Sequence, residues 1–243
     1  MHMLDPLVRW ASDAYSAGNE LRTLPVLFYH RVLPSPDPLQ PETVDCRLFR
    51  LHLSAISRVY EVVPLALGVA RLQNGTLRRR SLCLTFDDGY RDNFECALPI
   101  LREFGCTATF FVSSGFLNGG RIFADTVIEV VRRMPTGIQD FDWLGLGKRE
   151  VRDTASRRHL VEDLIKVIKY RSLEERREAC SRLEALAAST LPKDLMMNPS
   201  HILGLHRAGM SIGGHTVDHP ILSTLSPDEA RAQIVKDRDT LAG

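Results

Sequence analysis

The sequence holds two adjacent carboxylates at the place where a strand is expected to end. Asp87 and Asp88 follow the apolar run Ser81–Phe86 and precede Gly89. Neighbouring side chains on a strand point to opposite faces, so only a turn at the strand's end lets both carboxylates reach one site. Glycine permits the backbone angles of such a turn. Because two ionised carboxylates repel each other, the pair indicates a bound cation beside one of them.

Two histidines far along the chain are the matching candidates for that cation. His215 and His219 lie four positions apart, and Pro220 disfavours a helical backbone at His219, so we expect a compact loop. Two imidazoles and one carboxylate leave coordination positions open for water and substrate, as in catalytic zinc sites. The ion would activate water, and the aspartate that does not bind it would take the water's proton.

The elements expected around these residues are typical of a single α/β domain spanning residues 1–243. Strand, helix, strand with short connections is the pattern of a parallel sheet or barrel, and such folds place their sites at the carboxyl ends of the strands. Charged helical patterns at 151–170 and 172–188 predict an α-helical insertion at about 120–200. The remaining predicted elements are strands at 24–30, 81–86, 107–112 and 210–214, and helices at 49–60, 92–104 and from Ser226.

The composition narrows the class of protein further. Lys and Arg number 31 against 30 Asp and Glu, so no strong field would draw the chain to nucleic acid. The five cysteines are widely spaced without a Cys-x-x-Cys pair, which argues against a thiolate zinc site. Charges interrupt the apolar residues of Met1–Tyr15, and no stretch is long enough to span a membrane. We therefore expect a cytoplasmic protein, unless a targeting segment has been removed.

Two motifs give the sequence a family resemblance. Thr85–Tyr90 (TFDDGY) and His215–Pro220 (HTVDHP) resemble the first two motifs of NodB-like polysaccharide deacetylases, carbohydrate esterase family four. The resemblance implies a distorted (β/α) barrel and a hydrolase that removes N-acetyl groups from N-acetylhexosamine units of an oligo- or polysaccharide. It covers residues 24–116 and 205–241, with further similar segments at 29–32, 97–101, 108–112 and 220–223.

The resemblance also implies roles for individual residues. Asp87 would be the general base, while Asp88, His215 and His219 would hold a divalent ion, commonly zinc. Thr216 is expected to brace the histidine loop by hydrogen bonding.

Three more residues are candidates for lining the pocket or binding sugar. These are His30, Tyr90 and Arg91. A structural role is an equal alternative for His30, and packing is the favoured role for Tyr90 and Arg91.

The sequence departs from the family pattern in two respects. The first is the helical insertion between the two motifs, which occurs in some branches of the family, including those resembling deacetylases of bacterial exopolysaccharide export clusters. The chain ends at Gly243, ahead of the family's later motifs, so the resemblance implies a domain that is incomplete at its C-terminus. Four alternatives stay open: a deacetylase of O-acetyl esters, a hydrolase of a small cyclic amide, a non-catalytic or degenerate glycan-binding fragment, and a purely structural α/β domain whose aspartates cap a helix. An uncovered strand edge would also favour oligomerisation.

Overall fold

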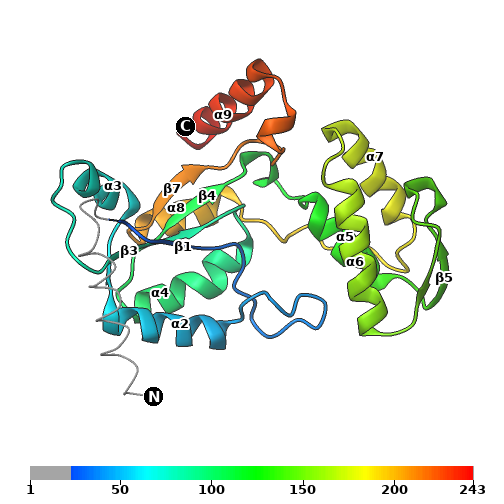
Figure 1. Cartoon of the computed structure of the whole chain (residues 1–243), viewed down its shortest axis with the longest axis horizontal. Helices are drawn as coiled ribbons and strands as arrows, with labels where there is room; N and C mark the ends of the chain where they lie inside the picture. The colour runs from blue at the N-terminus through cyan, green and yellow to red at the C-terminus, as the bar shows by residue number, and fades with distance from the viewer. Residues whose placement is uncertain (1–22, 243) are drawn as a thin grey trace.

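The fold is built around a parallel β-sheet (Figure 1). The computed structural model describes residues 23–242, so the stretch considered for a signal peptide lies outside the described residues. The strand order is β1-β3-β4-β7, and the short β2 also pairs with β3 in parallel. The strands are β1 (Val26–Tyr29), β2 (Glu61–Val62), β3 (Ser81–Phe86), β4 (Thr109–Val112) and β7 (Ser211–Gly214).

Helices lie on both sides of this sheet, and all six residues of β3 are buried. Burial on both faces explains why apolar residues of this strand follow one another, as in Leu82–Leu84, rather than alternating with polar ones. In Figure 1, α2 and α4 lie below the sheet and α9 lies above it. The helices are α2 (Cys46–Val59), α3 (Leu65–Gln73), α4 (Leu98–Glu103), α8 (Pro199–Arg207) and α9 (Pro227–Ala242), with the short turns η1 (Asn93–Ala97), η2 (Ser114–Phe116) and η4 (Leu222–Thr224).

Aromatic packing fixes the carboxyl end of the central strand. The ring of Phe86 stacks on that of Phe110 in β4, with centroids 4.7 Å apart. Phe49 of α2 meets Phe86 edge-on at 5.7 Å, and all three side chains are fully buried. Aromatic pairs in these arrangements stabilise a core by about 0.5–1.5 kcal/mol each beyond the area they bury. The chain therefore enters the turn at Asp87 and Asp88 from a rigid strand.

The predicted α/β class is confirmed, and the four predicted strands are found with small shifts at their ends. The described strands form an open sheet, where the resemblance implies an incomplete barrel. Capping boxes are present at Ser172–Glu175, before the helix Leu173–Glu184, and at Ser226–Glu229, before α9. In the described part of the chain no helix combines the length and the apolar character needed to span a membrane.

The start of the helix predicted at 92–104 differs from expectation. Asp92 makes no helix-capping hydrogen bond, and the segment begins as the π-helical turn η1 before α4. The Asp92 carboxylate instead binds the guanidinium of Arg31 at 2.7 Å and accepts a hydrogen bond from the backbone N–H of Val32. A charge-assisted hydrogen bond to a buried arginine is stronger than one to a helix N–H, so Asp92 binds Arg31 rather than capping the helix.

The insertion forms a separate lobe with its own hydrophobic core (Figure 1). The expectation that it is helical is wrong in one respect, because β5 and β6 pair as an antiparallel hairpin. Their sequences, GIQD and KREV, lack the apolar alternation that would reveal a strand. The elements of the lobe are α5 (Phe123–Arg133), β5 (Gly137–Asp140), η3 (Asp142–Leu144), β6 (Lys148–Val151), α6 (Thr154–Ile168) and α7 (Leu173–Glu184).

One ion pair ties the loop after β1 to the insertion. Arg132 of α5 binds both carboxylate oxygens of Asp37, with Nη1 to Oδ1 at 3.0 Å. Burial alone would raise the pKa of Asp37, but hydrogen bonds from Arg132, Leu39 and Gln40 lower it from 3.8 to about 2. The folded state thus binds the Asp37 proton more weakly than the unfolded chain does.

This ion pair gives a testable pH dependence. The contribution of Asp37 to stability is present above pH 3.8 and is lost as the pH falls towards about 2. The thermal midpoint of the wild type should therefore fall more steeply than that of Asp37→Asn across this range, as followed by circular dichroism. Parallel profiles for the two proteins would show that the pair does not stabilise the folded state.

Candidate metal centre

The turn after β3 presents both aspartates at the carboxyl edge of the sheet. The backbone N–H of Asp87 still donates to the Tyr29 carbonyl at 2.9 Å, which makes it the last ladder contact. Asp88 and Gly89 then take left-handed backbone angles, with φ of 74° and 90°. A Cβ at Gly89 would lie 2.9 Å from a methyl carbon of Val112, so this position requires glycine on two counts. The turn predicted from the sequence is confirmed.

The two histidines lie on a compact loop after β7, as expected. The His215 N–H donates to the Val112 carbonyl at 2.9 Å, and no helix forms before η4. Thr216 and His219 have φ of 69° and 52°. In residues 23–242 only two other residues besides glycine, Asp88 and Arg80, have a positive φ. Left-handed angles at such residues cost of order 1–3 kcal/mol each and cluster at functional sites. Three of the four strained positions therefore meet in this one place.

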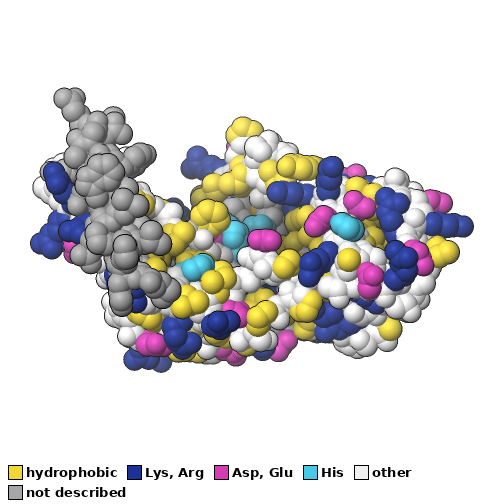
Figure 2. All heavy atoms as spheres, turned by 60° about the horizontal axis from the view of Figure 1, so that its bottom comes forward, with side chains coloured by type: hydrophobic (Ala, Val, Ile, Leu, Met, Phe, Trp, Pro, Cys, Tyr) yellow, Lys and Arg dark blue, Asp and Glu magenta, His cyan; other side chains and the backbone are white. Residues whose placement is uncertain are grey.

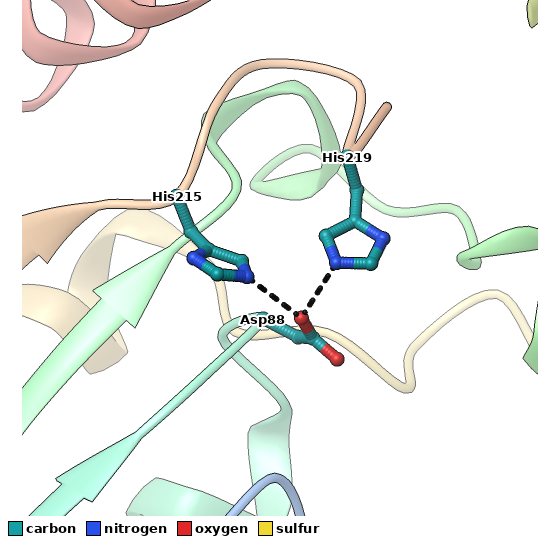
Figure 3. Close-up of side chains that lie close together, drawn as sticks. All are labelled: Asp88, His215 and His219. Carbon is teal, nitrogen blue, oxygen red and sulfur yellow. Dashed lines mark ion pairs between the residues drawn. The ribbon is translucent and has the colours of Figure 1, made fainter. Parts of the chain in front are cut away.

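Asp88, His215 and His219 converge on a single point (Figure 3). The Nε2 atoms of His215 and His219 lie 3.4 and 3.1 Å from Oδ1 of Asp88, and one ligand atom from each residue lies within 4.8 Å of the others. Oδ1 of Asp88 is buried, yet no hydrogen bond of good geometry reaches it from the described residues. Two imidazole nitrogens and an oxygen that face one another without sharing hydrogen bonds fit a bound cation.

The electrostatics favour a negative Asp88 and a more basic Asp87. Burial would raise the pKa of Asp88, but His215 and His219 hold it well below its usual range. Burial raises the pKa of Asp87, and the neighbouring Asp88 carboxylate acts in the same direction. The pKa of His215 is raised chiefly by its contact with Asp88. Two adjacent carboxylates thus have opposite shifts, as expected for a metal ligand beside a proton acceptor.

Two of the three metal-ligand candidates, Asp88 and His219, line a cavity of about 590 Å³ between the sheet and the insertion. Figure 2 shows histidine and acidic side chains gathered in a hollow near the middle of that face. His30 and Tyr90 line this cavity together with Asp88 and His219, so the structure brings two of the three predicted lining residues to the site. Its opposite wall comes from the insertion through Phe123, Ala124, Asp125, Ile128, Ile165 and Lys169.

Arg91, the third candidate for lining the pocket, does not line the cavity. Its guanidinium forms ion pairs with Glu95 and Asp194. Neither of these carboxylates lines the cavity. The structure therefore assigns Arg91 to packing, the role that the sequence favoured for it.

The hydrogen bonds expected from Thr216 are likewise not found. Its hydroxyl is buried without a hydrogen-bond partner among the described residues. The loop is braced instead by Gln233 of α9, whose side-chain oxygen accepts from the N–H groups of Val217 and Asp218. The Gln233 amide nitrogen also donates to the Asp218 carboxylate at 2.8 Å. The side-chain amide of Gln233 thus binds two successive N–H groups of the loop from a neighbouring helix, whereas the Thr216 hydroxyl binds neither of them.

A buried polar cluster beside the site was missed by the sequence reasoning. The Tyr90 hydroxyl donates to Asp125 at 3.0 Å, and Arg31 lies over the Tyr90 ring while pairing with Asp92 and Asp125. Burial raises the pKa of Asp125 to about 6. Only the position of Arg31 directly after His30 hinted at a role near the site. The cluster joins β1, the turn after β3 and α5, and so fixes the insertion against the site.

Comparisons with known proteins agree with this geometry. The sequence model of the polysaccharide deacetylase family matches residues 74–142 and 183–243, more than half of the chain. The matched ranges include all four residues of the carboxylate and histidine pairs and leave out 143–182, which holds α6 and most of α7.

Two individual proteins illustrate the similarity. "Putative polysaccharide deacetylase YxkH" of Bacillus subtilis is 28% identical over 91 residues, which are 37% of this chain and 31% of that protein. The chain thus spans about a third of that relative's length. The solved structure of the deacetylase PplD from Streptococcus pyogenes, in complex with acetate, has the same fold, with a TM-score of 0.54 and 19% identity over 90% of this chain and 67% of that one. With the family match covering both motifs, the chain belongs to the polysaccharide deacetylase family.

Proposed function

We propose that this chain is a metal-dependent hydrolase that removes N-acetyl groups from N-acetylhexosamine units of an oligo- or polysaccharide. The observation that carries the proposal is the convergence of Asp88, His215 and His219 at one point, beside the free carboxylate of Asp87. Membership of the polysaccharide deacetylase family supports the same reaction class.

The residues at the site divide into a binding set and a proton acceptor. Asp88, His215 and His219 would hold a divalent ion, with zinc the best match to a carboxylate and two imidazoles. When bound, such an ion supplies Lewis acidity towards a carbonyl oxygen and lowers the pKa of water. Asp87 takes the proton from the attacking water, and its raised pKa makes it a stronger base than an ordinary aspartate.

The cavity is suited to a sugar ring. Its volume of about 590 Å³ lies within the range of small-molecule sites, about 300–1,000 Å³. Aromatic and apolar side chains such as Phe28 and Phe123 line it together with the polar groups of His30 and Tyr90. His30 faces solvent in the cavity and can contact a sugar hydroxyl, whereas Tyr90 already donates its hydroxyl proton to Asp125.

Acetate release tests the proposal. The zinc-loaded protein should release acetate from a chitin oligomer and release less from an acetylated xylan, and treatment with a chelator should stop both reactions. Release of acetate from the xylan alone would mean that the substrate is an acetate ester and not an N-acetyl amide. Binding of the chitin oligomer without release from either substrate would favour a glycan-binding protein and contradict the hydrolase.

A further inference from the structure

A second cavity of about 450 Å³, here called the α7 cavity, adjoins the site on the insertion's side. It shares Ile122, Phe123 and His219 with the first cavity, so the two meet at a metal-ligand candidate. Helix α7 supplies a large part of its wall, through Leu173, Arg176, Arg177, Cys180, Ser181 and Glu184. A polymer whose acetyl group lies at Asp87 can therefore extend into the α7 cavity.

Arg176 is the unusual side chain of this cavity. It is only 6% exposed, and its Nε is buried without a hydrogen-bond partner. Across residues 23–242 no carboxylate lies within ion-pair distance of its guanidinium, which contacts the ring of Phe123 with its central carbon 5.2 Å from the centroid. Burial lowers the pKa of Arg176, but arginine stays protonated in proteins. Burying a guanidinium without an ion-pair partner is costly, and a bound anion would offset this cost.

The other two arginines of the cavity already have partners. Arg121 pairs with Glu184 and donates to the Pro192 carbonyl, and Arg177 binds the Asp218 carboxylate at 2.9 Å. The charged residues lining the cavity are therefore three guanidinium groups and two carboxylates. The positive charge left without a counter-charge is that of Arg176.

We propose that the α7 cavity binds an anionic group, a carboxylate or a phosphate, carried by the glycan next to the sugar whose acetyl group is hydrolysed. The planar guanidinium of Arg176 can donate two parallel hydrogen bonds to either group, which is the geometry that arginine offers and lysine does not. The position of the anion relative to the acetyl group rests on the proposed function. The preference of the cavity for an anion does not, because it requires neither metal nor turnover.

Calorimetric titration at low salt tests the preference with defined probes. A hyaluronan tetrasaccharide, which alternates N-acetylglucosamine with a carboxylated sugar, is compared with the neutral tetrasaccharide of chitin. N-acetylglucosamine 1-phosphate is compared with free N-acetylglucosamine to test phosphate as the source of the charge. The wild type should bind one anionic probe at least about tenfold more tightly than its neutral counterpart, as expected for hydrogen bonds to a charged group.

Variants of α7 distinguish a specific effect of Arg176 from a general effect of positive charge on this helix. Arg176→Gln should abolish the preference, whereas Arg182→Gln should keep it. Arg182 is a matched control because it lies on the same helix and over an aromatic ring, that of Trp143, but outside the cavity. Ser181→Asp adds a carboxylate from an exposed position of the cavity wall and should also reduce the preference, without replacing a buried residue.

The outcomes distinguish this inference from the proposed function. Equal binding of anionic and neutral probes by the wild type would overturn the anion site, even if the protein releases acetate from chitin. A preference that survives both Arg176→Gln and Ser181→Asp would overturn it as well. A preference lost in these two variants and kept in Arg182→Gln would establish the site, even if no acetate is released.

Discussion

Replacing Asp87 by asparagine is expected to reduce acetate release by about 100- to 10,000-fold, the usual contribution of a positioned general base. The physical reason is that the amide cannot take a proton from water, although it keeps the size and shape of the carboxylate. Because Asp87 is not one of the three residues that converge on the ion position, the variant should still take up metal. Steady-state acetate release and calorimetric titration with zinc measure the two effects separately.

A control variant tests whether Asp87 accepts the proton or binds the ion. Asp88→Asn removes one of the converging ligands and should lose metal affinity as well as activity. If Asp87→Asn retained wild-type turnover, the base would have to be another group. If it lost metal binding together with activity, Asp87 would instead belong to the ligand set.

Zinc is expected to raise the thermal midpoint of the wild type by about 5–10 °C. A ligand present at about 100 times its dissociation constant stabilises the folded state by about 2.7 kcal/mol, and each kcal/mol shifts the midpoint of a chain of this size by about 2–4 °C. The ion should act in this way because Asp88 is distant in the chain from the loop that holds His215 and His219, and the three meet only when the chain is folded. Thermal melts in zinc and in chelator measure the shift.

His215→Ala and His219→Ala should each abolish most of this shift, since two ligands hold an ion much less firmly than three. His206→Ala is the matched control, because His206 lies exposed on α8 and outside the cluster. Equal zinc-induced shifts in the wild type and the three variants would mean that the ion binds elsewhere.

Local signals in the sequence were sufficient for four strands of the parallel sheet and for the loops that carry the candidate metal ligands, but not for β2, β5 or β6. Four of the six residues of Ser81–Phe86 are apolar, as is typical of a strand buried on both faces, so the strand and its end could be predicted directly. The two aspartates and the glycine after it, and the proline after His219, restrict the backbone to turns and loops. Because parallel strands all end at the same edge of the sheet, the meeting of these two segments then follows from the topology.

Contacts between distant segments could not be predicted in the same way. The pairing of Arg31 with Asp92 and Asp125 joins three separate segments, and each residue alone looks like an ordinary surface charge. The brace supplied by Gln233 depends on how α9 packs against the loop, which no local pattern reveals. Arg176 lies in a charged helical pattern, and its burial against Phe123 depends on how α7 packs, which no local pattern reveals.

The most direct test of the account is the position of a bound metal in crystals of the protein grown or soaked with zinc. Anomalous diffraction at the zinc edge should show one strong peak at about 2.0–2.2 Å from a carboxylate oxygen of Asp88 and from a ring nitrogen of both His215 and His219. A fully loaded ion bound by other residues, or no peak near these three side chains at saturating zinc, would contradict the account.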